Sequence, residues 1–300
     1  MDHLMEFVED ANRRYIERPI HHVSVHCGQA FSGTFQWDNG VSREPRPLET
    51  LMLEEGLVEC VLADIKKYLR GRSWYRTRAL PYRRGYLFHG LPGTGKTSFA
   101  FAIASKLQLN IYSISLSSSG LDEEQLATLF RGLPKRCIVL LEDVDCSGIS
   151  HKRSDLAAST EKEDKTSGGL TLSSLFNILD GLATPESYLL IMTTNYREKL
   201  DKALIRPGQI DLEVPFSYAG EDIIRNLFSC LYDPSNQKSS EVSNNRIQDL
   251  AMEFTRQVPG GKFTAAEIQG YLLQHTGSPE DAVNGAENWA QNLLGEKQAV

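Results

Sequence analysis

The stretch that most limits what this chain can fold into is residues 90–97, with the sequence GLPGTGKT. It fills every fixed position of the pattern GxxxxGK[ST], in which a glycine-rich turn joins a strand to a helix. The flanking residues fit this context. Residues 85–89 have the pattern of a short buried strand, and residues 98–107 have the Ala-rich apolar pattern of a packed helix. The sequence therefore predicts a strand, a phosphate-binding loop and a helix in that order.

Glycines in such a loop let backbone N–H groups turn inward around a polyphosphate, at a helix N-terminus that also favours negative charge. Lys96 is expected to reach the β- and γ-phosphates, and the Thr97 hydroxyl to bind Mg²⁺, which prefers hard oxygen ligands. We therefore predict ATP and Mg²⁺ as cofactors. The residues predicted to bind the nucleotide all lie in or next to the loop: Gly90, Pro92, Gly93, Thr94, Gly95, Lys96, Thr97 and Ser98.

The composition indicates a broad class. The 300 residues are 41% apolar, which is ample for a core without a metal or disulfide staple. The five cysteines are scattered without a CxxC pair, which favours reduced thiols. A net charge of −7 argues against a nucleic-acid partner, and no apolar run has the length of a membrane span. The sequence itself is therefore typical of a soluble, globular chain.

Residues 1–47 differ in pattern from the rest of the chain. They contain a short helical stripe at 4–11, an alternating strand pattern at 22–26, and aromatic residues that suggest further strand before a turn at 38–40. We interpret this part as a partial, β-rich N-terminal piece. Prolines at 45 and 47 then mark a linker, because each pushes its predecessor out of the helical region.

A helix is predicted at 54–69, and the region 66–84 holds eight lysines and arginines with no acid among them. This basic stretch fits a solvated surface. It also fits a contact for phosphates, lipid head groups or an acidic neighbouring subunit.

A second group of chemically important residues comes after the apolar run 137–141. Glu142 and Asp143 stand directly behind this run, so they are expected at the carboxyl edge of a buried parallel strand, where ligands bind in open α/β sheets. One carboxylate is needed to hold Mg²⁺ and another to deprotonate the attacking water. By position, Glu142 takes the metal role with Thr97, and Asp143 takes the role of the base.

Residues 146–168 are mostly polar, and we predict a disordered insertion there because they cannot bury enough apolar surface to offset their ordering entropy. A helix is predicted after it, ending at Gly181. The apolar run 188–194 is another buried strand, with Asn195 at its tip. If this strand lies between the phosphate-loop strand and the acidic strand, Asn195 is expected beside the attacking water.

Four segments together resemble an AAA-type ATPase: GLPGTGKT, IVLLEDVD, IMTTNYREKLDKALIRPGQID and FTAAEIQGYL. The order Glu142 then Asp143, and the upstream segments PYRRGYLFHG and RPLETLMLEEGLVECVLADIKKYL, are similar to one branch, the mitochondrial Rieske-protein translocase family. The protein that gives this family its name is a membrane chaperone that completes respiratory complex III. The resemblance is strong over residues 45–275 and weak over 1–44.

The resemblance implies a homo-oligomeric ring, a protein client and a mitochondrial, inner-membrane location. Family members carry an N-terminal membrane helix before a longer β-rich domain, so membrane association is expected only through an N-terminal segment absent from this chain. The family's RPGR arginine reaches the neighbouring subunit's γ-phosphate. Gln209 stands at that place here, and Arg206 lies three residues upstream.

The predicted fold is an α/β phosphate-loop (AAA) domain, with a parallel sheet flanked by helices, plus a small helical C-terminal lid. The expected divisions are 1–47, an ATPase core at 48–217, and a lid and tail at 218–300. The catalytic candidates are Asp143, Glu142, Asn195 and Lys96. Two functions stay open: an ATP-hydrolysing chaperone or translocase, and a nucleotide-binding but hydrolysis-poor assembly subunit, which Gln209 favours. A small-molecule kinase is a distant third.

Overall fold

The computed structural model describes residues 22–116, 118, 120–145, 175, 177–179, 186–200, 205, 208–233 and 244–299. The predicted helical stripe at 4–11 and the predicted insertion at 146–168 lie outside the described residues.

Among the described residues, eight strands form one sheet in the order β2-β1-β5-β6-β7-β4-β8, with β3 paired to β1. The contacts between β1, β5, β6, β7, β4 and β8 are parallel, whereas β2 and β3 each pair with β1 in the antiparallel direction. The strands are β1 (Val23–Phe31), β2 (Thr34–Trp37), β3 (Val41–Arg43), β4 (Arg84–Gly90), β5 (Ile111–Ser115), β6 (Ile138–Glu142), β7 (Leu189–Thr194) and β8 (Leu212–Phe216).

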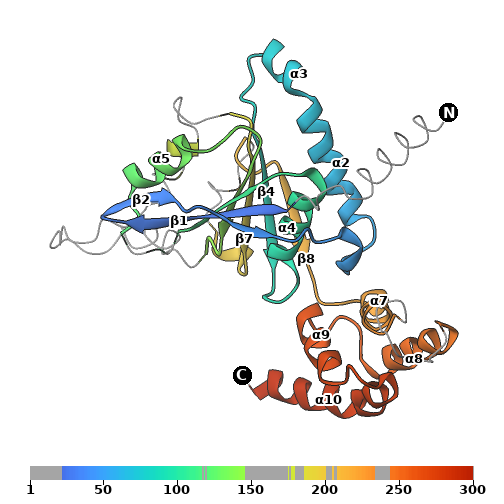
Figure 1. Ribbon diagram of the computed structural model, residues 1–300. Coiled ribbons are helices and arrows are strands. Elements are labelled where there is room, and N and C mark those ends of the chain that lie inside the picture. The colour runs from blue at the N-terminus through green and yellow to red at the C-terminus, as the bar shows by residue number, and fades with distance from the viewer. Residues whose placement is uncertain are drawn as a thin grey trace, which may run out of the picture.

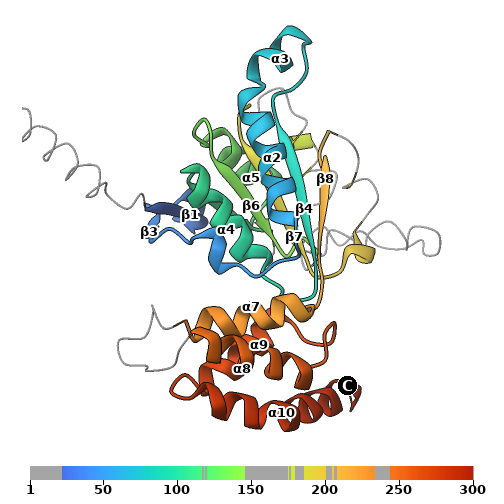
Figure 2. The ribbon, with the colours of Figure 1, turned by 90° about the vertical axis from the view of Figure 1, so that its right-hand side faces the viewer.

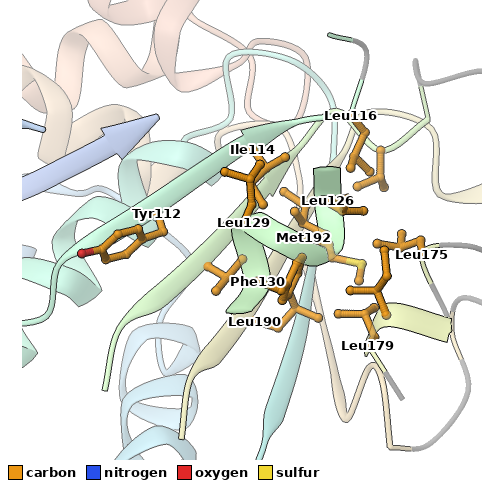
Figure 3. Packing of buried hydrophobic residues seen from close by; sticks show 14 of the residues in the cluster. Tyr112, Ile114, Leu116, Leu126, Leu129, Phe130, Leu175, Leu179, Leu190 and Met192 are labelled. Carbon is orange, nitrogen blue, oxygen red and sulfur yellow. The ribbon is translucent and has the colours of Figure 1, made fainter. Parts of the chain in front are cut away.

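Helices cover both faces of this sheet, which explains why its central strands are continuous apolar runs. In β6, Ile138 and Leu140 face the cluster under α2 (Leu57–Arg70) and α4 (Lys96–Leu107). Val139 and Leu141 face the opposite cluster, under α5 (Glu123–Arg131). Figure 3 shows this second cluster, with the apolar side of α5 packed onto β5 and β7.

The lid of the described chain is built from α7 (Glu221–Leu231), α8 (Asn244–Gln257), α9 (Ala265–Gln274) and α10 (Pro279–Ala299). These helices enclose a separate apolar cluster that contains Phe228 and Phe254. Figures 1 and 2 place them at one end of the sheet, with the short helix α3 (Arg72–Thr77) at the opposite end. The N-termini of two helices are stabilised by local sequence, because the side chains of Asp122 and Thr264 form capping boxes at α5 and α9.

The N-terminal strands belong to the same sheet as the ATPase strands. β1 pairs in parallel with β5, and the Trp37 indole donates to the Leu129 carbonyl of α5 at 3.0 Å. Phe35 is buried in the cluster under α5. This piece therefore extends the ATPase sheet, while the proposed boundary at residue 47 stays a prediction.

The sequence patterns miss β3, α3 and β8, all of them short. β8 lies at the edge of the sheet and contains Pro215, which lacks the N–H that a central strand needs. The short 3₁₀ turns η1 (Leu48–Thr50) and η2 (Arg197–Lys199) complete the described elements.

The basic stretch 66–84 covers the end of α2, all of α3 and the start of β4. Arg84 pairs with Asp64 at 2.9 Å and with Asp211 at 3.5 Å, so its charge has a structural role. Most cations of α2 and α3 in this stretch are exposed, and the guanidinium of Arg78, just after α3, stacks on the exposed ring of Trp74.

Candidate functional site

The phosphate-binding loop comes after β4 and leads into α4, as the sequence predicts. Its glycines adopt φ angles that favour glycine: 142° at Gly90, 77° at Gly93 and 100° at Gly95. At Gly90 the need is also steric, because a Cβ would lie 1.9 Å from the carbonyl oxygen of Phe216. The loop thereby places the N-terminus of α4, with its free N–H groups, at the carboxyl end of β4.

Lys96 is buried at the first position of α4, with 8% of its surface exposed. Its ammonium donates to the carbonyls of Gly90 at 2.6 Å and Leu91 at 2.8 Å, and to Oδ1 of Asn195 at 2.8 Å. Burial lowers the pKa of Lys96, and the charges of Asp143 and Asp145 act against that shift. The cation is therefore held at the loop by backbone and amide oxygens.

Thr97 and Glu142 meet, as their predicted metal role requires. The Thr97 hydroxyl donates to Oε1 of Glu142 at 3.0 Å, and the Ser113 hydroxyl donates to its Oε2 at 3.2 Å. A hydroxyl and a carboxylate at this distance are the oxygen ligands that Mg²⁺ prefers. The pair fits a magnesium ion that also contacts phosphates in the loop.

Asp143 and Asn195 meet at the same edge of the sheet. β7 lies between β4 and β6, so the condition for a site role of Asn195 is fulfilled. The Asn195 amide donates to Oδ1 of Asp143 at 3.2 Å, while its own oxygen accepts from Lys96. Asp143 has a φ of 47°, a conformation that is rare outside glycine and recurs at functional sites. A hydrogen-bonded series thus runs from Lys96 through Asn195 to Asp143.

Asp145 is a site residue that sequence reasoning did not assign. Its buried carboxylate accepts from the Thr194 hydroxyl at 2.6 Å and from the Asn195 backbone N–H at 3.1 Å. It therefore fixes the end of β7 and with it the Asn195 side chain. The signal was present, since Asp145 stands two residues beyond Asp143 in the same acidic run.

A cavity of about 370 Å³ opens beside the loop, between the ATPase core and the lid. The loop residues Gly93, Thr94 and Gly95 form one wall, the segment 46–53 another, and α7 and α9 the third. The lid contacts the loop directly, because the Ala266 N–H donates to the Gly93 carbonyl at 3.1 Å. With phosphate-binding groups at one end and apolar lid side chains at the other, the cavity suits a nucleotide.

Gln209 is buried within its own chain, whereas the resemblance implies a side chain that faces a neighbouring subunit. Its side chain is 4% exposed and lines a small cavity with Arg83 and Arg84, at the amino end of β4. The cause is Gly85, which lets the 209–210 backbone pack so closely that a Cβ would lie 1.7 Å from the Gln209 carbonyl oxygen. The subunit-facing position that the resemblance implies for residue 209 stays a prediction. Arg206 lies outside the described residues.

Among the described residues, no helix has both the length and the hydropathy needed to cross a membrane.

Comparison with known proteins finds two family models. The one described as "ATPase family associated with various cellular activities (AAA)" matches residues 86–218, and "Mitochondrial chaperone BCS1-like, ATPase lid domain" matches residues 221–288. These matches agree with the separation of the α/β core from α7–α10.

Similar curated proteins carry related names. The probable mitochondrial chaperone BCS1-B of Dictyostelium discoideum is 36% identical over 266 residues, which cover 82% of this chain and 55% of the relative. The mitochondrial chaperone BCS1 of Bos taurus is 37% identical over 249 residues, 83% of this chain and 57% of the relative. An AAA-ATPase of Arabidopsis thaliana is 32% identical over 252 residues, 83% of this chain and 51% of the relative. The chain spans little more than half the length of these relatives.

Proposed function

We propose that this chain, which belongs to the AAA ATPases with a BCS1-like lid, binds ATP with Mg²⁺ and hydrolyses it to ADP and phosphate to act on a protein client. The observation that carries the proposal is the hydrogen-bonded series from Lys96 through Asn195 to Asp143, beside the Thr97–Glu142 pair. These groups come from the carboxyl ends of the adjacent strands β6 and β7 and from the start of α4, after the phosphate-binding loop that follows the next strand, β4.

In this proposal each side chain has a separate task. Lys96 exchanges backbone carbonyls for phosphate oxygens and offsets their charge, while Thr97 and Glu142 hold the magnesium ion. Asp143 orients the attacking water and takes its proton. Asn195 can donate to the γ-phosphate or to Asp143 and accept from the water or from Lys96, so it links phosphate binding to the base.

We further propose that the chain works as a ring of identical subunits on a protein client in mitochondrial respiratory complex assembly, at the inner membrane. The support is the names of the relatives, several of which are mitochondrial chaperones, together with the BCS1-like lid.

A second candidate is a nucleotide-binding subunit that hydrolyses poorly and acts through assembly. Gln209 favours it, because a neutral and buried side chain occupies the position where the resemblance implies a trans-acting arginine. Without a cation from a neighbour, charge that develops on the transferred phosphoryl group is less well stabilised.

The test is the steady-state rate of Mg²⁺-dependent ATP hydrolysis against protein concentration, for wild type, Lys96→Ala and Lys106→Ala. Lys106 is the matched control, since it is an exposed lysine at the far end of the same helix. A hydrolysis rate per subunit that rises with protein concentration, and that is lost in Lys96→Ala but not in Lys106→Ala, supports the ring ATPase. Tight ATP binding with negligible hydrolysis supports the second candidate. No binding of ATP by the wild type refutes both.

A further inference from the structure

Arg46 is a cation at the candidate site that the function proposed above does not use. It lies in the linker before η1, and its guanidinium donates from Nη1 to the Ser98 hydroxyl at 3.0 Å. Its backbone N–H donates to the hydroxyl of Ser105, two turns further along α4, at 3.1 Å. Two separate hydrogen bonds therefore hold this residue against α4.

The surroundings of Arg46 are short of negative charge. The side chain is half-buried, and among the residues that the structure describes it forms no ion pair with a carboxylate. Its guanidinium also lies at the first turn of α4, where the helix dipole is positive and a cation is disfavoured. Lys96 adds a second cation to the same turn. An anion bound at this point would relieve the repulsion and complete the hydrogen bonding of the guanidinium.

The position of Arg46 along the cavity indicates which anion that is. Lys96 and Thr97 face Asn195 and Glu142, at the end of the site where the terminal phosphates belong. The apolar lid residues Leu227 and Leu272 line the opposite end, which suits a base. Arg46 and Ser98 line the same cavity as these lid residues, and Ser98 directly follows Lys96 and Thr97 in the first turn of α4. In a nucleoside polyphosphate, the anionic group between the terminal phosphates and the base is the phosphate that carries the ribose.

We propose that Arg46 is a specificity-determining residue that binds the α-phosphate of the nucleotide, while Ser98 keeps its guanidinium oriented. This inference rests on the proposed nucleotide site and adds a contact made from outside the phosphate-binding loop. A guanidinium has five N–H donors, so it can donate to Ser98 and to a phosphate oxygen together. Because every nucleotide from monophosphate to triphosphate has an α-phosphate, the contact favours phosphorylated ligands over the free nucleoside at the base end of the site.

The test measures affinities of ATP, ADP, AMP and adenosine by titration calorimetry, for wild type, Arg46→Gln, Arg46→Lys, Arg43→Gln and Lys96→Ala. Arg43 is the matched control, an exposed arginine three residues upstream in β3. Loss of a charge-assisted hydrogen bond is worth roughly tenfold to a hundredfold in affinity. We expect Arg46→Gln to weaken ATP, ADP and AMP by a similar factor in this range and to leave adenosine unchanged. Arg46→Lys should recover part of the loss, and Arg43→Gln should lose nothing.

Lys96→Ala separates the two contacts, because it should weaken ATP and ADP far more than AMP. Equal weakening of adenosine and AMP by Arg46→Gln would mean that the linker has collapsed, and it would overturn the proposal. Unchanged AMP and ADP affinity in Arg46→Gln would overturn it as well. If the wild type binds no nucleotide in the same titrations, the proposed function itself fails, which is a different result from either of these.

Discussion

Asp145 offers the sharpest test of how the sheet positions its chemistry. Its carboxylate is buried and accepts hydrogen bonds from the Thr194 hydroxyl and the Asn195 N–H at the end of β7. Asp145→Ala removes the acceptor and leaves both donors without this partner. Each buried donor left unsatisfied costs about 1–3 kcal/mol, so with two donors we expect the free energy of unfolding to fall by about 2–6 kcal/mol.

The same substitution should slow hydrolysis, because the anchored N–H belongs to Asn195. A shift of about 1 Å in a positioning group can cost roughly a hundredfold in rate. ADP affinity should fall less, since the loop and the Lys96 contacts to backbone carbonyls stay in place. Asp145→Asn keeps one acceptor oxygen and should show a smaller loss in both quantities.

The assays are urea unfolding followed by circular dichroism, ADP titration and steady-state hydrolysis, all on the same preparations. Asp122→Ala is the control, because it removes the cap of α5 and costs about 1 kcal/mol away from the site. The anchoring role would be refuted if the free energy of unfolding of Asp145→Ala lies within about 0.5 kcal/mol of the wild-type value, as is usual for a surface substitution, and its hydrolysis rate equals that of the wild type. Equal slowing in Asp122→Ala would attribute the effect to general destabilisation.

Three further outcomes are expected from the site. Lys96→Ala should weaken Mg·ATP binding substantially by removing charge-assisted contacts to phosphate, and unchanged affinity in calorimetry would contradict the phosphate-binding loop. Asp143→Asn should keep nucleotide bound but slow hydrolysis, whereas Glu142→Gln should mainly alter the Mg²⁺ dependence of the rate. Hydrolysis at the wild-type rate in Asp143→Asn would exclude Asp143 as the base. Residues 117–121 after β5 contain no aromatic side chain for gripping an extended polypeptide, so we expect a folded or specifically docked client, and ATP-driven unfolding of an unrelated tagged protein would contradict this.

The parts of the structure that sequence patterns predict are the local ones. The strand, loop and helix around Lys96 and the buried strand before Glu142 depend on residues a few positions apart, and both are confirmed. The meeting of Asn195 with Asp143 could be predicted only conditionally, because it depends on which strand lies between which. That order is a property of the whole sheet.

The parts that the patterns miss depend on contacts distant in the sequence. The Ser24 N–H donates to the side chain of Asn110, 86 residues away, and Trp37 donates to a carbonyl 92 residues away. No local periodicity in the sequence predicts that β1 joins the sheet beside β5. Asp145 was missed for a related reason, since an acidic run does not reveal which carboxylate turns inward to hold the next strand.

Gln209 shows how such a long-range contact alters a prediction about mechanism. The alignment of RPGQ with the family's RPGR implies a side chain that faces the neighbouring subunit. In the structure that side chain is 4% exposed and lines a small cavity with Arg83 and Arg84. A third arginine in this cavity would be a poorly solvated cation next to Arg83 and to Arg84, which already pairs with Asp64 and Asp211, and a buried charge without a partner of its own costs about 3–5 kcal/mol.

We therefore expect Gln209→Arg to lower the free energy of unfolding by about 3–5 kcal/mol, or by less if the longer side chain reaches solvent. The hydrolysis rate per folded subunit should stay unchanged. Gln209→Met, similar in length but uncharged, is the matched control and should be more stable than Gln209→Arg. A trans-acting arginine is worth about 10³–10⁵ in rate. Hydrolysis that rises at least tenfold in assembled Gln209→Arg, with stability unchanged, would show that residue 209 faces the neighbouring nucleotide. Arg206→Ala, measured at the same assembly state, tests whether the nearby arginine has that task instead.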